Sequence, residues 1–227
     1  MEGLEGKEAV RTKVTQAIAN RGLEALVATG PDNVVYLTQC ALPYAPNFPN
    51  RRAVAIVTRE GHGAVVCPFE WADLIREQGW DGEIHAYPES ATPGPLLAAM
   101  EQALAALRLS QGAVGMDALR IPQSLAEAWA GCWSGLNWQP CDDLLRTLRM
   151  VKTAGELDRL QTAARHTDRA IIALCHHTEG MVDAVSYALV EATERLRVHI
   201  GEYGGSAAGH LAVLQGLDCQ HLYLPPR

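Results

Sequence analysis

The sequence lacks several features that would assign it to a specialised class of protein. It contains no apolar run long enough to span a membrane. The amino terminus, MEGLEGKEAVRTK, is charged and has no apolar core of the kind that a signal peptide needs. Neither a P-loop nor a G-x-G-x-x-G motif occurs, and no Ser/His/Asp order typical of hydrolases is present. We therefore expect a cytoplasmic protein without membrane contact.

Cysteine is sparse, and basic residues are not in excess. The six cysteines are dispersed and form no C-x-x-C pair, which argues against a zinc knuckle or a disulfide scaffold. Small reduced thiols in a cytosolic protein are the simpler interpretation. The net charge of −7 leaves no surplus of Lys and Arg to neutralise phosphates, so nucleic-acid binding is not expected.

What the sequence does contain, over its first two thirds, is an alternation of short β-like runs and helical segments. Helices are predicted over 10–21, 69–78, 96–109 and 124–132, and strands over 23–29, 34–37, 53–58, 64–67, 84–87 and 113–116. Residues 59–63 make a hairpin turn, and the three prolines of 41–50 mark a loop. This order predicts an α/β fold, a mixed sheet covered by helices. We expect the domain to cover 1–150 and a second one to begin at 151.

The junction at 144–171 joins a basic, apolar run to a capped helix. Thr153 and Glu156 have the spacing of a capping box, in which each side chain accepts from the other residue's amide. A helix is predicted over 156–176, followed by another near 182–198. Apolar or small residues recur at helical spacing and predict one buried stripe: Leu157, Leu160, Ala164, Ile171 and Leu174.

Taken in order, several segments resemble the creatinase/prolidase (M24) family of Xaa-Pro peptidases, creatinase and their relatives. The junction is the most specific of them, with Asp142, the run Leu148-Arg-Met-Val-Lys152 and then Glu156-Leu157. One departure is Gln39, which stands after Tyr36-Leu-Thr38 where the family usually has glycine. The other matching segments are Leu23-Glu-Ala-Leu-Val27, Gly30-Pro-Asp-Asn33, Arg51-Arg52, Gly115-Met-Asp117, Gly180-Met181, Gly216, Gln220-His221 and Pro225.

The resemblance implies a complete creatinase-type N-terminal domain over 1–150 and the first part of a pita-bread metallopeptidase domain over 151–227. Complete family proteins hold two divalent metal ions (Mn, Zn or Co) with two aspartates, a histidine and two glutamates. All five ligands lie downstream of the stretch that His221 resembles. We therefore expect no metal bound to this chain and no hydrolysis by its 227 residues alone. His176 and His177 are adjacent on a helix and point about 100° apart, so they make a poor ligand pair.

Three residues are candidates for the site. His221 is expected to be catalytic by resemblance, donating to charge that develops on a carbonyl oxygen rather than binding metal. Arg51 and Arg52 follow the proline-rich loop and are candidates for substrate binding, since an arginine can bind a carboxylate through two hydrogen bonds. In the family the N-terminal domain often reaches a neighbouring subunit's active site, so the resemblance also implies a homodimer.

The function implied is that of an Xaa-Pro aminopeptidase or dipeptidase, a two-metal hydrolase of peptides with proline at the second position. Two alternatives stay open. One is a creatinase-like amidinohydrolase of the same fold, and the other is a non-catalytic binding or dimerisation module. The metal ligands and pocket residues that would separate these alternatives are not among the 227 residues.

Overall fold

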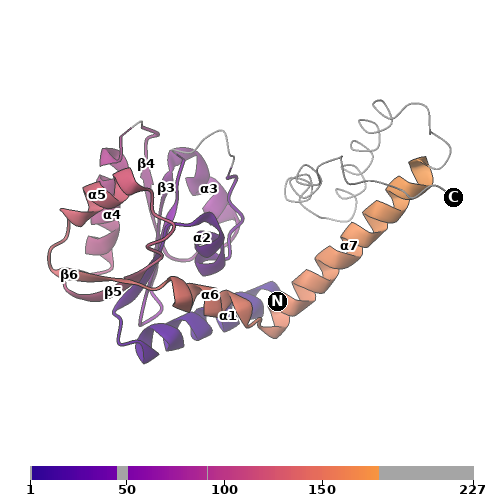
Figure 1. Cartoon of the computed structure of the whole chain (residues 1–227), viewed down its shortest axis with the longest axis horizontal. Helices are drawn as coiled ribbons and strands as arrows, with labels where there is room; N and C mark the ends of the chain where they lie inside the picture. Colours follow the sequence, from indigo (N-terminus) through magenta and orange to yellow (C-terminus); the bar gives the residue numbers. More distant parts are fainter. Residues whose placement is uncertain (1, 45–50, 91, 179–227) are drawn as a thin grey trace. The chain divides into compact units, whose positions relative to one another are not determined.

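The computed structural model describes residues 2–44, 51–90 and 92–178. Those of the first unit, up to Gly155, form one mixed sheet with helices on both faces (Figure 1). The strands, in spatial order, are β4 (Glu83–Tyr87), β3 (Gly63–Pro68), β2 (Val54–Thr58), β1 (Ala25–Ala28), β5 (Gly112–Met116) and β6 (Leu136–Pro140). The helices are α1 (Glu2–Asn20), α2 (Pro31–Thr38), α3 (Phe69–Glu77), α4 (Gly94–Ala106), α5 (Gln123–Ala130), α6 (Asp142–Met150) and α7 (Ala154–Thr178). The predicted α/β fold with a mixed sheet is confirmed.

The pairing of the strands follows from the lengths of their connections. β2 and β3 are antiparallel and joined by the short turn that the sequence predicts. β3 and β4 are parallel, as are β5 and β6, and each of these pairs is bridged by a helix, α3 and α5 respectively. Parallel neighbours need such a crossover because the chain must return to the same end of the sheet. β1 is central, antiparallel to β2 and parallel to β5.

Successive side chains of β1 enter two separate cores, because neighbouring residues of a strand point to opposite faces of the sheet. Leu26 and Ala28 pack with α1, α2, α3 and α6, whereas Ala25 and Val27 pack with α4 and α5. All four are fully buried. Figure 1 shows the sheet between α4 and α5 on one side and α2 and α3 on the other. The unit that contains the sheet is thus a three-layer arrangement, and β1 is an unbroken apolar run because both its faces are covered.

One predicted strand is wrong, and two elements were not predicted. Residues 34–37, with two adjacent valines, form the middle of helix α2 instead of a strand. Pro31 stands in the first turn of this helix and Val34 N–H donates to the Gly30 carbonyl at 2.9 Å, so the preceding turn starts a helix. The missed elements are β6, whose sequence Leu136–Pro140 is half polar because it is an edge strand, and α6.

Gln39 ends α2 in a left-handed conformation, with φ 53° and ψ 29°. This is the position where the resembling family usually has glycine, which adopts such a conformation without a steric penalty. The Gln39 backbone N–H donates to the Val35 carbonyl at 2.8 Å, and its side-chain amide donates to the Tyr36 carbonyl at 2.7 Å. The turn keeps a glycine-type geometry although a glutamine occupies it.

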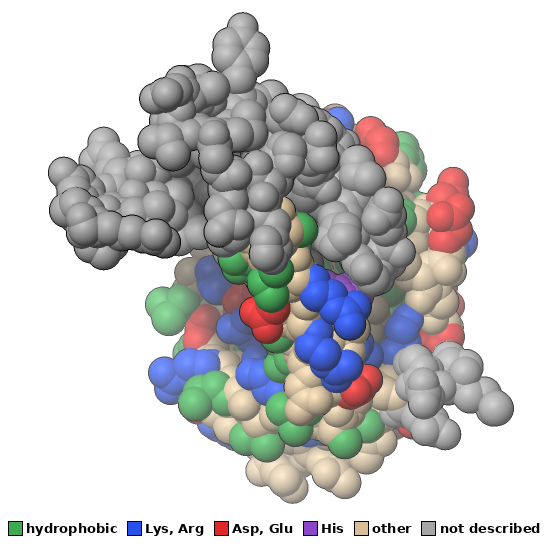
Figure 2. Space-filling model, turned by 90° about the vertical axis from the view of Figure 1, so that its right-hand side faces the viewer, with side chains coloured by type: hydrophobic (Ala, Val, Ile, Leu, Met, Phe, Trp, Pro, Cys, Tyr) green, Lys and Arg blue, Asp and Glu red, His purple; other side chains and the backbone are tan. Residues whose placement is uncertain are grey.

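Contacts divide the chain into two units, Met1–Gly155 and Glu156–Arg227. The stripe of α7 predicted to be buried is exposed at Leu157, Leu160 and Ile171, each roughly half accessible. Helical spacing tells which side chains share a face, but not what covers that face. No described helix is long and apolar enough to cross a membrane. On the face shown in Figure 2, basic side chains lie among acidic and hydrophobic ones. The helix expected near 182–198 lies outside the described residues.

Candidate functional site

The two candidate arginines lie at one end of the sheet, beside the ends of two other strands. β2 begins at Val54, two residues after Arg52, and runs antiparallel to β3, so the start of β2 lies next to the end of β3. β4 runs parallel to β3, and its last residue Tyr87 pairs with Pro68. Arg51 and Arg52 therefore share this end with the residues that follow β4. We call Tyr44, Arg51, Arg52, Tyr87 and Glu89 the arginine rim.

Arg51 is already held by a carboxylate. Its Nε donates to Glu89 Oε2 at 2.8 Å, and both side chains are about one-third exposed, at 30% and 35%. An ion pair at this exposure is weak, because water screens it and competes for its hydrogen bonds. A carboxylate ligand could therefore replace Glu89 on the guanidinium without a large loss.

Arg52 is held through its backbone by Tyr87. The Arg52 N–H donates to Tyr87 Oη at 3.2 Å, and the same hydroxyl donates to the Arg52 carbonyl at 2.6 Å. Burial raises the pKa of Tyr87 to about 12, although the hydrogen bond with the Arg52 backbone and the nearby guanidinium act in the opposite direction. The phenol thus stays protonated at neutral pH and keeps its donor. These two hydrogen bonds fix the backbone from which the Arg52 side chain projects.

Tyr44 completes the rim. Its ring packs edge-on against Trp71 of α3, with centroids 5.1 Å apart and an angle of 80° between the planes. Burial raises its pKa, while the Arg52 charge opposes that shift. The Tyr44 hydroxyl is buried and has no hydrogen-bond partner among the described residues. A buried donor of this kind is satisfied by water or by a ligand oxygen.

The rim combines two guanidinium groups with two phenols that stay neutral, and this set suits a carboxylate or a peptide carbonyl. The sequence predicts Arg51 and Arg52 from their place after the proline-rich loop, and the structure places both beside the residues at and after the end of β4. The sequence patterns miss Tyr44, Tyr87 and Glu89. These residues come from a loop and from the end of an edge strand, and whether they lie near the arginines depends on the strand register. The structure does not test the proposed substrate-binding role, which stays a prediction.

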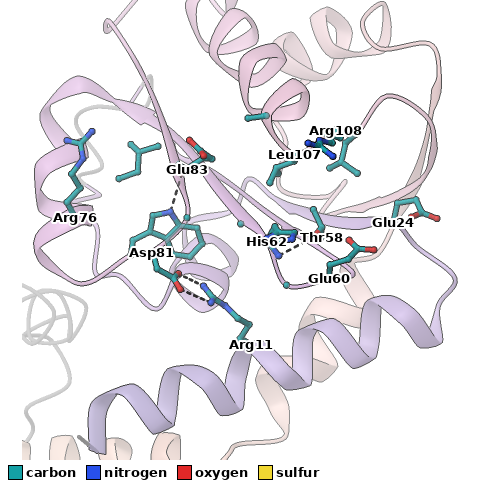
Figure 3. A pocket seen from close by; sticks show the side chains of 17 residues that line it. Arg11, Glu24, Thr58, Glu60, His62, Arg76, Asp81, Glu83, Leu107 and Arg108 are labelled. Atoms are coloured by element: carbon teal, nitrogen blue, oxygen red, sulfur yellow. Dashed lines mark hydrogen bonds and ion pairs between the residues drawn. The ribbon is translucent and has the colours of Figure 1, made fainter.

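A second concavity lies at the opposite end of the sheet, with a volume of about 1120 Å³ (Figure 3). It lies between the β2–β3 turn, the start of β4 and the end of α4. The Trp80 ring fills its wall so closely that a Cβ added at Gly63 or Gly82 would come within 2.8 Å of the ring. Arg11 donates to Asp81, and this pair lowers the pKa of Asp81 through its hydrogen bond. Much of the charge lining this pocket is thus neutralised within the chain.

Two turn segments that carry the family resemblance meet in a buried network and not in a reaction centre. Asp117, at the end of β5, is fully buried and accepts from the backbone N–H groups of Thr29 and Gly30. It also accepts from the Thr29 hydroxyl and from the Asn33 amide. A carboxylate with this many internal donors is committed to holding the fold. The Gly30-Pro-Asp-Asn33 and Gly115-Met-Asp117 segments are therefore joined for architecture.

The described residues offer no place for the two metal ions that the resemblance implies. Within residues 2–44, 51–90 and 92–178, no group of three or more His, Cys, Asp or Glu side chains could hold a metal ion. The predicted catalytic residue His221 lies outside the described residues, as do the Gly180-Met181 and Gly216 segments. Their roles stay predictions.

The Creatinase/Prolidase N-terminal domain family matches residues 11–151, which is more than half of the chain. The chain belongs to this family. Its match runs from within α1 to the residue after α6, and so includes the whole sheet, the arginine rim and the Asp117 network. The recognition of a creatinase/prolidase N-terminal domain from the order of its segments is confirmed.

Known proteins similar to this family member are peptidases by name. "Putative dipeptidase YkvY" of Bacillus subtilis is 24% identical over 181 residues, which cover 79% of this chain and 48% of that protein. The X-Pro aminopeptidase from Thermotoga maritima shares the fold with a TM-score of 0.61 at 13% identity, covering 86% of this chain and 49% of that one. The prolidase from Thermococcus sibiricus shares the fold with a TM-score of 0.60 at 16% identity, covering 88% of this chain and 51% of that one.

These likenesses extend beyond the N-terminal domain, since 86% and 88% of this chain are covered. The chain spans about half the length of these three relatives. At such low identity the structural likeness establishes the fold, and activity is a separate matter.

Proposed function

We propose that this chain is part of an Xaa-Pro dipeptidase or aminopeptidase, a hydrolase that cleaves the peptide bond before proline. The single observation that supports this most is the family match over 11–151, which includes the whole described sheet. Proteins similar in sequence or in fold carry the names of a dipeptidase, an X-Pro aminopeptidase and a prolidase. The substrate class is therefore a peptide with proline at its second position.

In this proposal the chemistry needs two divalent metal ions (Mn, Zn or Co) held by residues other than those described. When bound, such a pair activates a water molecule and polarises the scissile carbonyl. The described residues would contribute binding and orientation. Arg51 and Arg52 would bind the free carboxylate of a peptide, with the Tyr44 hydroxyl as an additional donor. His221 would donate to the carbonyl oxygen as charge develops on it.

The proposal also places the arginine rim at the active site of a neighbouring copy, in a homodimer. Within its own unit the rim has no metal-ligating group beside it among the described residues. Side chains that bind substrate must nevertheless lie within hydrogen-bond distance of it. A second subunit would supply the reacting centre against which this rim closes.

The test uses the full-length protein that carries this chain, incubated with Mn²⁺, Zn²⁺ or Co²⁺. Xaa-Pro dipeptides and longer Xaa-Pro peptides are compared with matched Xaa-Ala peptides, which keep the same length and charge. We expect cleavage that needs proline at the second position and is abolished by EDTA. A preparation of residues 1–227 alone is the control, and we expect no turnover from it.

Two other outcomes would overturn the proposal. Hydrolysis of creatine without cleavage of Xaa-Pro peptides would indicate an amidinohydrolase of the same fold. Saturable peptide binding without turnover, at every metal tried, would indicate a binding or dimerisation module. Isothermal titration with the same peptides separates the second outcome from a misfolded preparation, because a misfolded protein would not bind.

A further inference from the structure

The last turn of α6 is held by side chains from the other end of the sequence. Lys13 of α1 donates to the backbone carbonyls of Leu148 and Val151, and its Nζ lies 3.2 Å from Tyr36 Oη. Tyr36, on α2, donates its own hydroxyl to the Leu148 carbonyl at 3.0 Å. The contacts with Leu148 and Val151 join residues 112 to 138 positions apart in the sequence. We call Lys13 and Tyr36 the junction clamp.

The clamp satisfies backbone groups that a helix leaves open. The last carbonyls of a helix have no partner within the helix, and each needs another donor. At the end of α6, the Thr147 carbonyl accepts from the Val151 N–H at 3.2 Å. The Leu148 carbonyl accepts hydrogen bonds from both clamp residues. The Lys13 ammonium has three N–H donors, one for each of its three acceptors: the Leu148 carbonyl, the Val151 carbonyl and the Tyr36 hydroxyl. A cation at this position also interacts favourably with the helix dipole.

The clamp differs from an ordinary exposed cap in its burial. Tyr36 and Leu148 are only 7% and 4% exposed, and Lys13 is partly buried. Lys152 caps the same helix end by donating to the Arg149 and Met150 carbonyls, but it is exposed, so water can replace it. Water cannot reach the buried Leu148 carbonyl as easily. Loss of the Lys13 ammonium therefore leaves Tyr36 as the remaining clamp donor to the buried Leu148 carbonyl, whereas loss of the Lys152 ammonium affects carbonyls of exposed contacts, which water can reach.

A further tie reinforces the same turn. Arg149 Nη1 lies 2.6 Å from Asp32 Oδ2 in the first turn of α2, and Arg120 contacts the same carboxylate at 2.7 Å. Helix α2 is thus bound to the end of α6 at both Asp32 and Tyr36. Its own carboxyl end leads through Gln39 to Tyr44 of the arginine rim. One short helix therefore contacts the junction and also leads into the candidate substrate-binding loop.

We propose that Lys13 is a positioning residue: with Tyr36, it locks the last turn of α6 and so fixes the point from which the chain enters its second unit. The local part of this proposal concerns residues 147–153 alone. The consequence for catalysis rests on the proposed peptidase function, because it requires that the rim and the reacting centre meet in one geometry.

The first experiment measures amide hydrogen exchange in the chain, in peptides that cover 142–153. Lys13→Met keeps most of the packing stem and removes the ammonium. We expect exchange within 147–153 to rise on the order of tenfold, as for one lost charge-assisted bond. Lys152→Met is the matched control, with the same loss of charge at the same helix end, and should change exchange less than about twofold.

Peptides from α4, which packs on the opposite face of the sheet, serve as the internal reference for global opening. Equal exchange in Lys13→Met and Lys152→Met would overturn the clamp. If Lys13→Met fails to fold, Tyr36→Phe gives the same test, since it removes one of the two donors to Leu148 and keeps the ring. Unchanged exchange at 147–153 in Tyr36→Phe would then count against the proposal.

The second experiment measures Xaa-Pro hydrolysis by the full-length protein. In Lys13→Met we expect kcat/KM to fall on the order of tenfold, mainly through KM, because a displaced rim weakens substrate binding. Lys152→Met should keep the wild-type values. Faster exchange with unchanged KM would overturn the positioning role. If the wild-type protein does not cleave Xaa-Pro peptides, the proposed function fails, and hydrogen exchange alone still decides whether the clamp exists.

Discussion

Asp117 accepts hydrogen bonds from both the backbone N–H and the hydroxyl of Thr29, each at 2.8 Å, although the two residues are 88 positions apart. The same carboxylate receives the Gly30 N–H at 2.8 Å and the Asn33 amide at 2.9 Å. The ends of β1 and β5 and the first turn of α2 are thereby tied to one buried group. Because α2 leads to Tyr44 of the arginine rim, the Asp117 carboxylate also helps to position the segment that enters the rim.

Replacing Asp117 with asparagine should destabilise the fold strongly. One acceptor oxygen becomes an NH₂ donor that faces other donors, and the remaining partners stay buried. We expect the free energy of unfolding to fall by about 2–4 kcal/mol, measured by urea denaturation. Asp143→Asn, which breaks an exposed pair with Arg21, is the control and should stay close to wild type. Similar losses in both variants would contradict the role given to burial.

Gln39 offers a test of backbone strain. Gln39→Gly relieves the left-handed conformation but loses the side-chain bond to the Tyr36 carbonyl, whereas Gln39→Ala loses the same bond and keeps the strain. We expect the glycine variant to be more stable than the alanine variant by about 1 kcal/mol, from thermal unfolding of both. The reverse order would show that the turn does not adopt this geometry in solution.

Two buried groups should make the fold sensitive to alkali. Burial raises the pKa of the Cys67 thiol from 9.0 to about 12, and the pKa of the Tyr87 phenol from 10.0 to about 12. Above pH 9 the unfolded chain releases these protons before the folded one does. The unfolded state then binds fewer protons, and the free energy of unfolding falls as pH rises from about 9 towards 12.

Denaturation midpoints measured between pH 8 and 11 would show this slope. Cys67→Ala removes one of the two groups and should flatten the slope, and adding Tyr87→Phe should flatten it further. The stability of both variants at pH 7 serves as the reference for lost packing. A slope that is identical in wild type and in the double variant would assign the alkaline loss to other groups.

The Arg51–Glu89 pair gives a test of substrate binding in the full-length enzyme. If Arg51 binds the substrate carboxylate, Glu89 competes for the same guanidinium. Arg51→Ala should then raise KM for Xaa-Pro dipeptides about tenfold with little change in kcat, and Glu89→Gln should lower KM about twofold. Arg76→Ala, at an exposed pair elsewhere on the domain, is the control. An unchanged KM in Arg51→Ala would contradict the role of Arg51 in binding the substrate carboxylate.

Most of the sheet follows from local sequence. The runs at 53–58 and 64–67 are apolar and rich in β-branched residues, and the glycines between them permit a tight turn, so the hairpin of β2 and β3 is predictable from local sequence. α4 is rich in alanine and leucine and forms at its predicted place, within a few residues of the predicted ends. The family was also recognisable at this level, because it depends on short segments in a fixed order.

Other elements depend on partners that are far away in the sequence. The two valines of α2 favour a strand locally, yet that segment is helical because Asp117 holds its first turn and because the sheet covers its apolar face. β6 has a weak local pattern and forms against β5. α6 has a strongly amphipathic sequence, and its buried leucines Leu144, Leu145 and Leu148 pack in the core that α1 shares. In such cases tertiary contacts outweigh intrinsic propensity.

The sequence by itself thus determined the family and the mixed sheet, and it made the two arginines after the proline-rich loop candidates for substrate binding. Only the tertiary structure brought Tyr44, Tyr87 and Glu89 to those arginines, and Lys13 to the end of α6. The reason is physical: turns, hairpins and capped helices are decided by neighbours within a few residues. A rim or a clamp is decided by strand register and by helices packing across the sheet, which no spacing along the chain encodes.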